Sequence, residues 1–219
     1  MMEQGSLFEP THAATESREP LRTGALVLRG FARSEAAMLL VDLEAICRQA
    51  PLRHMQTPGG FRMSVGMTNC GPLGWISDRR GYRYDSIDPL SGRPWPAVPV
   101  SFLDLASRAA SESGYGQFVP DACLVNRYEP GARLTPHQDK DERDFREPIV
   151  SVSLGLSAVF QFGGPKRADT LVRIVLQHGD TVVWGGVSRL CYHGVLPLRA
   201  GIHPATGTAR INLTFRRAG

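Results

Sequence analysis

The sequence of 219 residues is 42% hydrophobic and 21% charged, a balance typical of a globular domain with a sizeable core. Its formal net charge is +4, and all of its 25 basic residues except Lys140 and Lys166 are arginine, which gives only weak support for nucleic-acid binding. The longest apolar runs are too short to cross a bilayer, and the polar N-terminus has no apolar signal segment, so neither a membrane protein nor an exported protein is expected.

The N-terminal elements come in the order tail, strand and two helices. Residues 1–20 lack periodic apolar positions, so we expect a mobile tail. The apolar stretch of residues 21–31 predicts a strand. Residues 34–50 carry apolar side chains at helical spacing and begin with Ser34, a residue suited to capping a helix N-terminus. Similar spacing after a proline predicts a second helix over residues 100–113.

Between the two helices, residues 52–96 combine many glycines and prolines with large side chains. These large side chains are Met55, Phe61, Met63, Met67, Trp75, Tyr82, Tyr84 and Trp95. Short strands are expected at residues 61–68 and 81–84. A loop-rich segment with so many aromatic side chains favours a binding lid over a core.

From Asp121 onward, the pattern changes to short apolar strands separated by glycine and proline turns. The predicted strands are residues 122–129, 148–156, 158–163, 171–177, 180–186, 190–198 and 209–216. This spacing predicts a mainly β fold with flanking helices (α+β), built as a β-sandwich or a jelly-roll barrel. We expect one structural domain, in which residues 21–120 form an N-terminal extension with the lid and residues 121–219 form the core.

The cysteines indicate a reducing compartment. Cys47, Cys70, Cys123 and Cys191 are scattered, with neither a Cys-x-x-Cys pair nor a dense framework. Such spacing is typical of free thiols, so we expect a cytoplasmic protein.

A possible metal site lies in the polar stretch TPHQDKDE. His137 and Asp139 are two residues apart, so at the end of a strand both side chains lie on one face, about 7 Å apart along the backbone. For a third ligand, His193 within LCYHGVLPL is a better candidate than His178, which lies in a His-Gly-Asp turn. Two histidines and one carboxylate form a facial triad that leaves open positions on Fe(II).

Less specific interpretations remain open for these residues. A lone His-x-Asp is common in proteins that bind no metal, and His193 could be a hydrogen-bonded core histidine. The triad alone also fits a zinc or nickel enzyme of the cupin type that acts on small molecules. A nucleic-acid-binding module without catalysis is a third possibility, but it gives no reason for three metal ligands.

The C-terminal strand ARINLTFR favours an iron enzyme that binds an acid. Alternation places Arg210, Asn212, Thr214 and Arg216 on one face, and it places apolar side chains on the other. If the apolar face packs into the fold, both arginines point into the barrel. Buried arginines need anionic partners, so a small dicarboxylate is expected between them. Asn126 and Tyr128 alternate on one face of an earlier strand and could donate hydrogen bonds into the same cavity.

Together these segments resemble the Fe(II)- and 2-oxoglutarate-dependent oxidative demethylases of the AlkB type. The matching stretches are NRYEPGARLTPHQDKDE, SLGLSAVFQFGG, HGDTVVWGG, YHG and RINLTFR, with TPGGFRMSVGMTNCGPLGW as the nucleotide-recognition lid. The resemblance spans about residues 20–217 and implies a double-stranded β-helix. Two positions depart from the family pattern: Phe61 replaces a tyrosine, which puts one contact to the DNA strand in doubt, and Ile211 replaces an aromatic residue.

The resemblance also implies roles for the site residues. His137, Asp139 and His193 would bind iron, Arg210 would hold the distal carboxylate of 2-oxoglutarate, and Arg216 would lie near its iron-bound end. Supporting hydrogen bonds would come from Asn126, Tyr128 and Asn212. The expected substrate contacts are Thr57, Met63, Trp75, Tyr82, Arg83, Tyr84, Asp141 and Arg167, with Trp75 and His137 on either side of the base.

The implied activity is repair of alkylated DNA, and of RNA as a further substrate. Oxidative N-demethylation of 1-methyladenine or 3-methylcytosine would consume 2-oxoglutarate and O₂ and release formaldehyde, succinate and CO₂. The damaged base must leave the stack to enter a barrel, so single strands or base flipping are expected. The protein is expected to act as a monomer.

Overall fold

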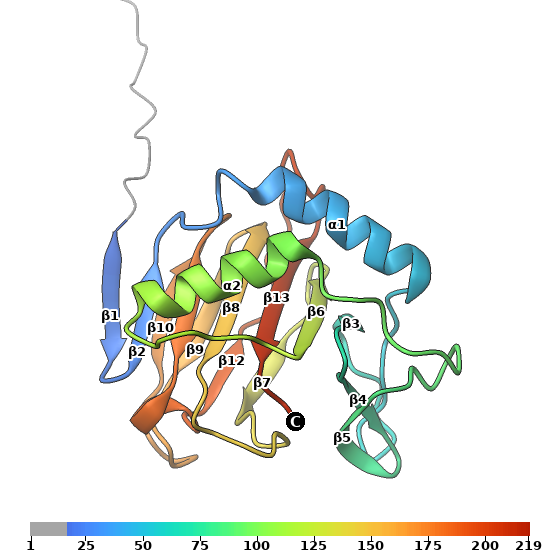
Figure 1. Ribbon diagram of the computed structural model, residues 1–219. Coiled ribbons are helices and arrows are strands. Elements are labelled where there is room, and N and C mark those ends of the chain that lie inside the picture. The colour runs from blue at the N-terminus through green and yellow to red at the C-terminus, as the bar shows by residue number, and fades with distance from the viewer. Residues whose placement is uncertain (1–16) are drawn as a thin grey trace, which may run out of the picture.

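The computed structural model describes residues 17–219 (Figure 1). Most of the predicted tail, residues 1–16, lies outside the described residues, and the strand β1 already begins at Arg18. The helices are α1 (Ala36–Gln49) and α2 (Val100–Glu112), with a short 3-10 helix at Gly186–Ser188. In the described part of the chain, no helix is both long and apolar enough to span a membrane.

Two antiparallel sheets form the barrel, and a hairpin stands beside it (Figure 1). The large sheet has the order β1 (Arg18–Arg22), β2 (Ala25–Leu28), β11 (Thr181–Trp184), β8 (Ile149–Gly155), β13 (Arg210–Arg216), β6 (Ala122–Tyr128) and β3 (Gly66–Cys70). The small sheet has the order β10 (Val172–Leu176), β9 (Ala158–Phe162), β12 (His193–Val195) and β7 (Leu134–His137). The hairpin pairs β4 (Gly74–Asp78) with β5 (Gly81–Asp85).

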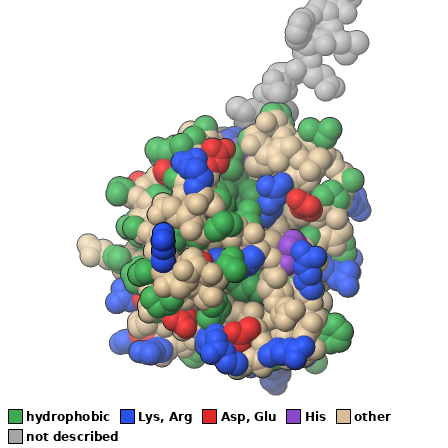
Figure 2. Space-filling view, turned by 90° about the vertical axis from the view of Figure 1, so that its right-hand side faces the viewer, with side chains coloured by type: hydrophobic (Ala, Val, Ile, Leu, Met, Phe, Trp, Pro, Cys, Tyr) green, Lys and Arg blue, Asp and Glu red, His purple; other side chains and the backbone are tan. Residues whose placement is uncertain are grey.

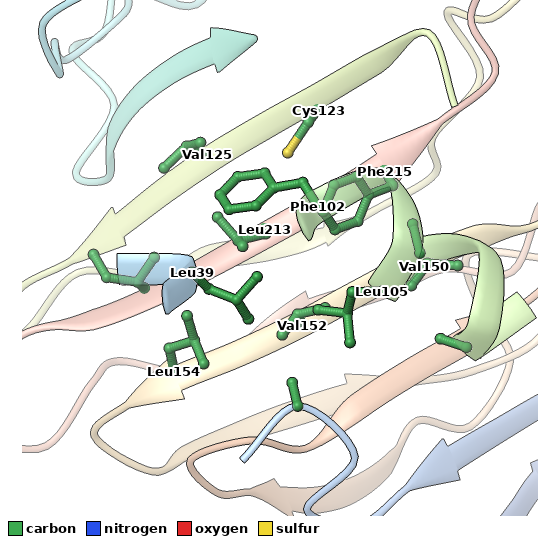
Figure 3. Packing of buried hydrophobic residues seen from close by; sticks show 14 of the residues in the cluster. Leu39, Phe102, Leu105, Cys123, Val125, Val150, Val152, Leu154, Leu213 and Phe215 are labelled. Carbon is green, nitrogen blue, oxygen red and sulfur yellow. The ribbon is translucent and has the colours of Figure 1, made fainter. Parts of the chain in front are cut away.

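Both helices cover the outer face of the large sheet (Figure 1). Figure 3 shows Phe102 and Leu105 of α2 and Leu39 of α1 packed on side chains of β6, β8 and β13. Phe102 and Phe215 meet edge to face, with ring centroids 5.8 Å apart. Because one face of β13 packs on these helices, the arginines of its other face point between the two sheets, as the alternation predicts.

The fold corrects several predictions for the N-terminal half. Residues 21–31 do not form one strand, because the chain reverses at Gly24, which has a φ of 75°, to form the β1–β2 hairpin. Ser34 is not the N-cap of α1; Glu35 holds that position and makes no side-chain capping bond. The second helix agrees closely with its predicted range.

The loop-rich segment, which was predicted to favour a lid over a core, contributes to the core. Met55, Met67 and Trp95 are buried and belong to a second apolar cluster between the sheets. The strand β3 extends the large sheet at β6, whereas β4 was not predicted, because its Trp75 and Ile76 lie among loop-forming residues. Each strand predicted after residue 121 overlaps an observed strand, and β7 is an additional short one.

Candidate metal centre and its cavity

A cavity of 360 Å³ lies between the two sheets and opens toward the β4–β5 hairpin. Its walls come from β3, β6, β8, β11 and β13 of the large sheet and from β7, β9 and β12 of the small one. Figure 2 views the side of the molecule on which this hairpin lies, where a histidine and many arginine and lysine side chains reach the surface. A cavity of this size accommodates a small organic acid and part of a larger ligand.

The predicted metal ligands meet at this cavity. His137 on β7 and His193 on β12 are directly paired across the small sheet, and their ring centroids are 4.6 Å apart. Asp139 follows β7, with one carboxylate oxygen 3.7 Å from His137 Nε2 and the other 3.7 Å from His193 Nε2. One donor atom from each residue lies within 4.8 Å of the other two, which is compact enough for one metal ion after small adjustments.

Backbone carbonyls fix the tautomer of both histidines. His137 Nδ1 lies 2.9 Å from the carbonyl oxygen of Thr135, and His193 Nδ1 lies 3.0 Å from that of Cys191. A carbonyl oxygen only accepts, so each Nδ1 carries the proton and donates it. Each Nε2 therefore presents its lone pair to the cavity, which is the arrangement that a metal-binding histidine needs.

Electrostatics favours the protonation states that bind metal. Burial raises the pKa of the Asp139 carboxyl, but Arg216 and the two histidines outweigh this effect and hold that pKa well below its ordinary value. Burial, with His137 as a second cause, lowers the pKa of His193 to about 4. At neutral pH the site thus offers a carboxylate and a neutral buried imidazole, which are the forms that ligate iron.

Arg216 is the counter-ion of Asp139. Its Nη2 and Nε lie 2.6 and 2.9 Å from the same carboxylate oxygen, Oδ2. Burial lowers the pKa of the guanidinium, but Asp139, Tyr84 and Glu142 outweigh this effect and raise it. Asp139 therefore supplies the anionic partner that buried Arg216 needs.

Arg210, in contrast, has donors without a partner. Its Nη2 donates to Ser153 Oγ at 2.8 Å, but Nε and Nη1 are buried and make no hydrogen bond with the described residues. Its guanidinium carbon lies 4.9 Å from the ring centroid of Tyr128. Burial lowers the pKa of Arg210. Two unpartnered donors on a buried cation are costly unless an anion binds, so this end of the cavity suits a carboxylate.

An amide network forms the wall between the two arginines. Asn126 Nδ2 donates to Asn212 Oδ1 at 3.2 Å, and Asn212 Nδ2 donates to Ser151 Oγ at 2.8 Å. The Oδ1 atom of Asn126 is buried and has no partner among the described residues. The wall is therefore rigid and still offers an acceptor to a ligand.

The hairpin side chains form the mouth of the cavity. Trp75 and Tyr82 are stacked, with ring centroids 5.6 Å apart and planes inclined by 13°. Since Tyr82 covers one face of the indole, a ligand can stack only on the other. Tyr84 reaches deeper and donates from its hydroxyl to Glu142 Oε1 at 2.8 Å. The remaining predicted contacts at the mouth, Thr57, Met63, Asp141 and Arg167, also line the cavity.

Arg83 is the one predicted site residue that is absent from the cavity wall. Its two Nη atoms lie 3.0 and 2.8 Å from the carboxylate oxygens of Asp78 on the neighbouring strand. Alternation along β5 places Tyr82 and Tyr84 on the cavity side and Arg83 on the other. Arg83 is therefore paired with Asp78 outside the cavity wall, and its contact with a substrate stays a prediction.

Sequence reasoning missed two buried charged residues beside the metal cluster: Glu142, which lines the cavity, and Arg189, which lies behind it. Their side chains are 1% and 3% exposed, and Glu142 Oε2 lies 3.2 Å from Arg189 Nη2. Glu142 belongs to the run DKDE, which is typical of a solvated loop, and Arg189 follows a turn in GGVSRL. Neither local pattern indicates burial. His178 has the predicted role of a turn residue, since its Nδ1 accepts the N–H of Gly155.

Comparison with known proteins agrees with this geometry. The profile described as the 2OG-Fe(II) oxygenase superfamily matches residues 24–216. Alpha-ketoglutarate-dependent dioxygenase AlkB of Escherichia coli (strain K12) is 60% identical over 202 residues, which cover 92% of this chain and 94% of that protein. DNA N(6)-methyladenine demethylase ALKBH1C of Arabidopsis thaliana is 33% identical over 171 residues, 66% of this chain and 38% of that protein. The solved structure of OsALKBH1 has a TM-score of 0.82 at 27% identity and covers 92% of this chain and 100% of that chain.

Proposed function

The chain belongs to the AlkB family of the 2OG-Fe(II) oxygenase superfamily, and on that premise we propose that it demethylates alkylated bases in nucleic acids by oxidation. The observation that carries the proposal is the cavity itself. A two-histidine, one-carboxylate cluster and a buried arginine with free donors line the same cavity, below a mouth lined with aromatic side chains.

The residues of the cluster would hold Fe(II) through His137 Nε2, His193 Nε2 and the carboxylate of Asp139. When bound, Fe(II) with 2-oxoglutarate and O₂ supplies the oxidation of an N-methyl group, which yields succinate, CO₂, formaldehyde and the unmodified base. Arg216 keeps Asp139 ionised and in place, so that this carboxylate is available to the metal at neutral pH.

Arg210 would bind the distal carboxylate of 2-oxoglutarate with its free Nε and Nη1 atoms. Asn126, Tyr128 and Asn212 line the same end of the cavity and would add hydrogen bonds. A zinc or nickel enzyme without an acidic cosubstrate would leave those buried donors unsatisfied. Arg210 therefore favours a 2-oxoglutarate enzyme over that alternative.

Apolar side chains would keep water from the reacting methyl group. Trp184 and Phe160 pack against His193, with ring centroids 4.9 and 6.1 Å from the imidazole. The base would stack between the free face of Trp75 and His137, whose side chain is 40% exposed at the cavity. Thr57, Tyr82 and Arg167 at the rim would contact the adjoining sugar-phosphate chain, and Met63 would pack against the base.

Nucleic acid is the proposed partner, because Lys140 and Arg167 line the cavity and further arginine and lysine side chains reach the surface on this side of the molecule, where they suit a phosphate backbone (Figure 2). A base can enter only after it leaves its stack, so single strands and flipped bases in DNA are the proposed substrates, with RNA as a further one. We also propose a cytoplasmic monomer, in which residues 21–120 supply the lid and residues 121–219 the catalytic core.

The test is turnover of a defined lesion. The protein would be mixed with Fe(II), 2-oxoglutarate, O₂ and an oligonucleotide that carries 1-methyladenine, and then assayed for formaldehyde and adenine. We expect both products, and neither when the metal is chelated or when 2-oxoglutarate is left out. Consumption of 2-oxoglutarate without any conversion of methylated bases would contradict a nucleic-acid substrate.

A further inference from the structure

The loop between β7 and β8 carries the carboxylate of the metal cluster but has no regular secondary structure. Its backbone is tied to the barrel at few points, one of which is the hydrogen bond from Arg143 N to Ala218 O at 3.1 Å. A metal ligand must be held to within a fraction of an ångström to bind well. Side chains must therefore supply the order that a strand would have supplied.

Arg189 is the side chain that spans this loop. Its Nη1 donates to the backbone carbonyl of Asp139 at 2.9 Å, and its Nε donates to the carbonyl of Glu147 at 3.1 Å. Its Nη2 lies 3.2 Å from Glu142 Oε2, and its guanidinium carbon lies 5.3 Å from the ring centroid of Phe145. The guanidinium of Arg189 therefore contacts the loop near its beginning at Asp139, in its middle at Glu142 and at its end at Glu147.

These contacts close a ring around Asp139. Arg216 holds its carboxylate, and Arg189 holds its backbone carbonyl. Glu142 joins the two arginines, with Oε1 3.4 Å from Arg216 Nε and Oε2 3.2 Å from Arg189 Nη2. Asp139 is therefore fixed at both ends, and rotation of its side chain or shift of its backbone would break at least one charged contact.

Stability alone is a weak explanation for this ring. Burial of an ion pair carries a desolvation cost that can exceed the attraction between the charges, and an apolar pair of similar volume is often as stable. Buried charged networks are better suited to specifying one arrangement of a loop. Arg189 also does not line the cavity, so it is not placed to touch a ligand.

We propose that Arg189 is a positioning residue. Its hydrogen bond to the Asp139 carbonyl and its ion pair with Glu142 hold the Asp139 carboxylate where the metal binds. The inference rests on the proposed metal centre and adds a residue to the machinery that supports it. It predicts that loss of Arg189 weakens metal binding itself, in the absence of 2-oxoglutarate and nucleic acid.

The experiment is a titration of the full-length chain with Mn²⁺ alone, followed by calorimetry or by the electron paramagnetic resonance signal of the free ion. Arg189→Met keeps the length of the side chain and removes every donor. We expect its Kd for Mn²⁺ to rise about tenfold or more, the scale on which residues that orient metal ligands act. The thermal melting curve of each variant is recorded in parallel.

Arg29→Met is the matched control. Arg29 also donates to a buried carboxylate, Asp180, which is 2% exposed, but it contacts no residue of the β7–β8 loop. The Arg29→Met substitution should lower the melting temperature without changing the Kd for Mn²⁺. An equal rise in Kd for both variants would overturn the proposal, because the effect would then follow from general destabilisation.

Arg189→Met/Glu142→Gln guards against a single variant that fails to fold, since it removes a buried carboxylate charge that has lost Arg189 and keeps only its 3.4 Å contact with Arg216 Nε among the two arginines of the ring. We expect the double variant to melt above Arg189→Met and to retain the weakened Mn²⁺ affinity, because the grip on the Asp139 carbonyl is still missing. Wild-type affinity in the double variant, or in folded Arg189→Met, would overturn the proposal. In either case Mn²⁺ binding by the wild-type chain leaves the proposed function standing, whereas failure of the wild-type chain to bind would contradict both.

Discussion

The indole Nε1 of Trp75 donates a hydrogen bond to Oδ2 of Asp141 at 2.8 Å and so joins the β4–β5 hairpin to the loop that carries Asp139. Both residues line the cavity. The bond orients the plane on which a base would stack, and it leaves Oδ1 of Asp141 free for a ligand. Asp141 can therefore have two roles: it orients Trp75, and its carboxylate favours a positively charged base.

The first prediction separates these two roles. 1-Methyladenine and 3-methylcytosine carry a positive charge, which the Asp141 carboxylate at the exposed mouth of the cavity favours. Asp141→Ala should lower kcat/KM for these cationic lesions by about tenfold or more, the scale of one good charged hydrogen bond. The kcat/KM for the neutral lesion 1-methylguanine should fall by a smaller factor.

Trp75→Phe is the control for the orienting role, because it keeps a stacking ring and removes the indole donor. It should lower kcat/KM for both lesion classes alike. Equal losses on both classes in Asp141→Ala would mean that Asp141 only orients the indole or the loop.

The second prediction concerns the metal ligands. His137→Ala or Asp139→Ala should reduce demethylation below detection and weaken metal binding, because each removes one of three donors. The barrel should remain folded, since neither residue belongs to its two apolar clusters. Formaldehyde release and circular dichroism of each variant test this. Normal turnover with Fe(II) supplied would refute the assignment of the ligands.

The third prediction concerns Arg210, whose Nε and Nη1 are the free buried donors. Arg210→Lys keeps the charge but loses the planar fork that matches a carboxylate. The apparent KM for 2-oxoglutarate should rise about tenfold or more, on the scale of a lost charge-assisted hydrogen bond, while the KM for the oligonucleotide changes little. Arg29→Lys makes the same exchange outside the cavity and should change neither value. An unchanged KM for 2-oxoglutarate in Arg210→Lys would remove this residue from the cosubstrate site.

The fourth prediction is a pH dependence of stability at His178. Burial lowers the pKa of this imidazole, and the neighbouring His203 and Arg33 lower it further. The folded protein therefore favours the neutral ring, whose Nδ1 accepts the N–H of Gly155 at 2.9 Å. The stabilisation is fully present above the unfolded pKa of about 6.5, and it is lost as the pH falls below that value toward the folded pKa.

His178→Asn keeps a side-chain acceptor and removes the titrating group. Melting temperatures of metal-free wild-type and variant protein between pH 7.5 and 5 test the prediction, with a smaller decline expected for the variant. His193, whose pKa is also lowered, titrates in both proteins and so cancels in the comparison. Parallel declines would show that His178 does not contribute.

The sequence by itself determined the elements in which the spacing of apolar residues matches the face that the fold buries. In β13, period-two alternation separates the arginines from Ile211, Leu213 and Phe215, and the two faces do meet the cavity and the helices. The same rule places His137 and Asp139 together, and helical spacing predicts α2 within a residue or two. These features are local, so a linear pattern contains them.

Only the tertiary structure decided which distant residues meet. The direct pairing of His137 with His193 follows from the register of β7 on β12, and no local pattern encodes a register between strands so far apart in the chain. Arg83 lies away from the cavity because its strand turns that face toward Asp78, and Glu142 is buried because Arg189 and Arg216 approach it from other elements. A charged side chain in a polar run is equally compatible with water and with a buried ion pair; long-range packing selects between them, since it alone brings the opposite charge within reach.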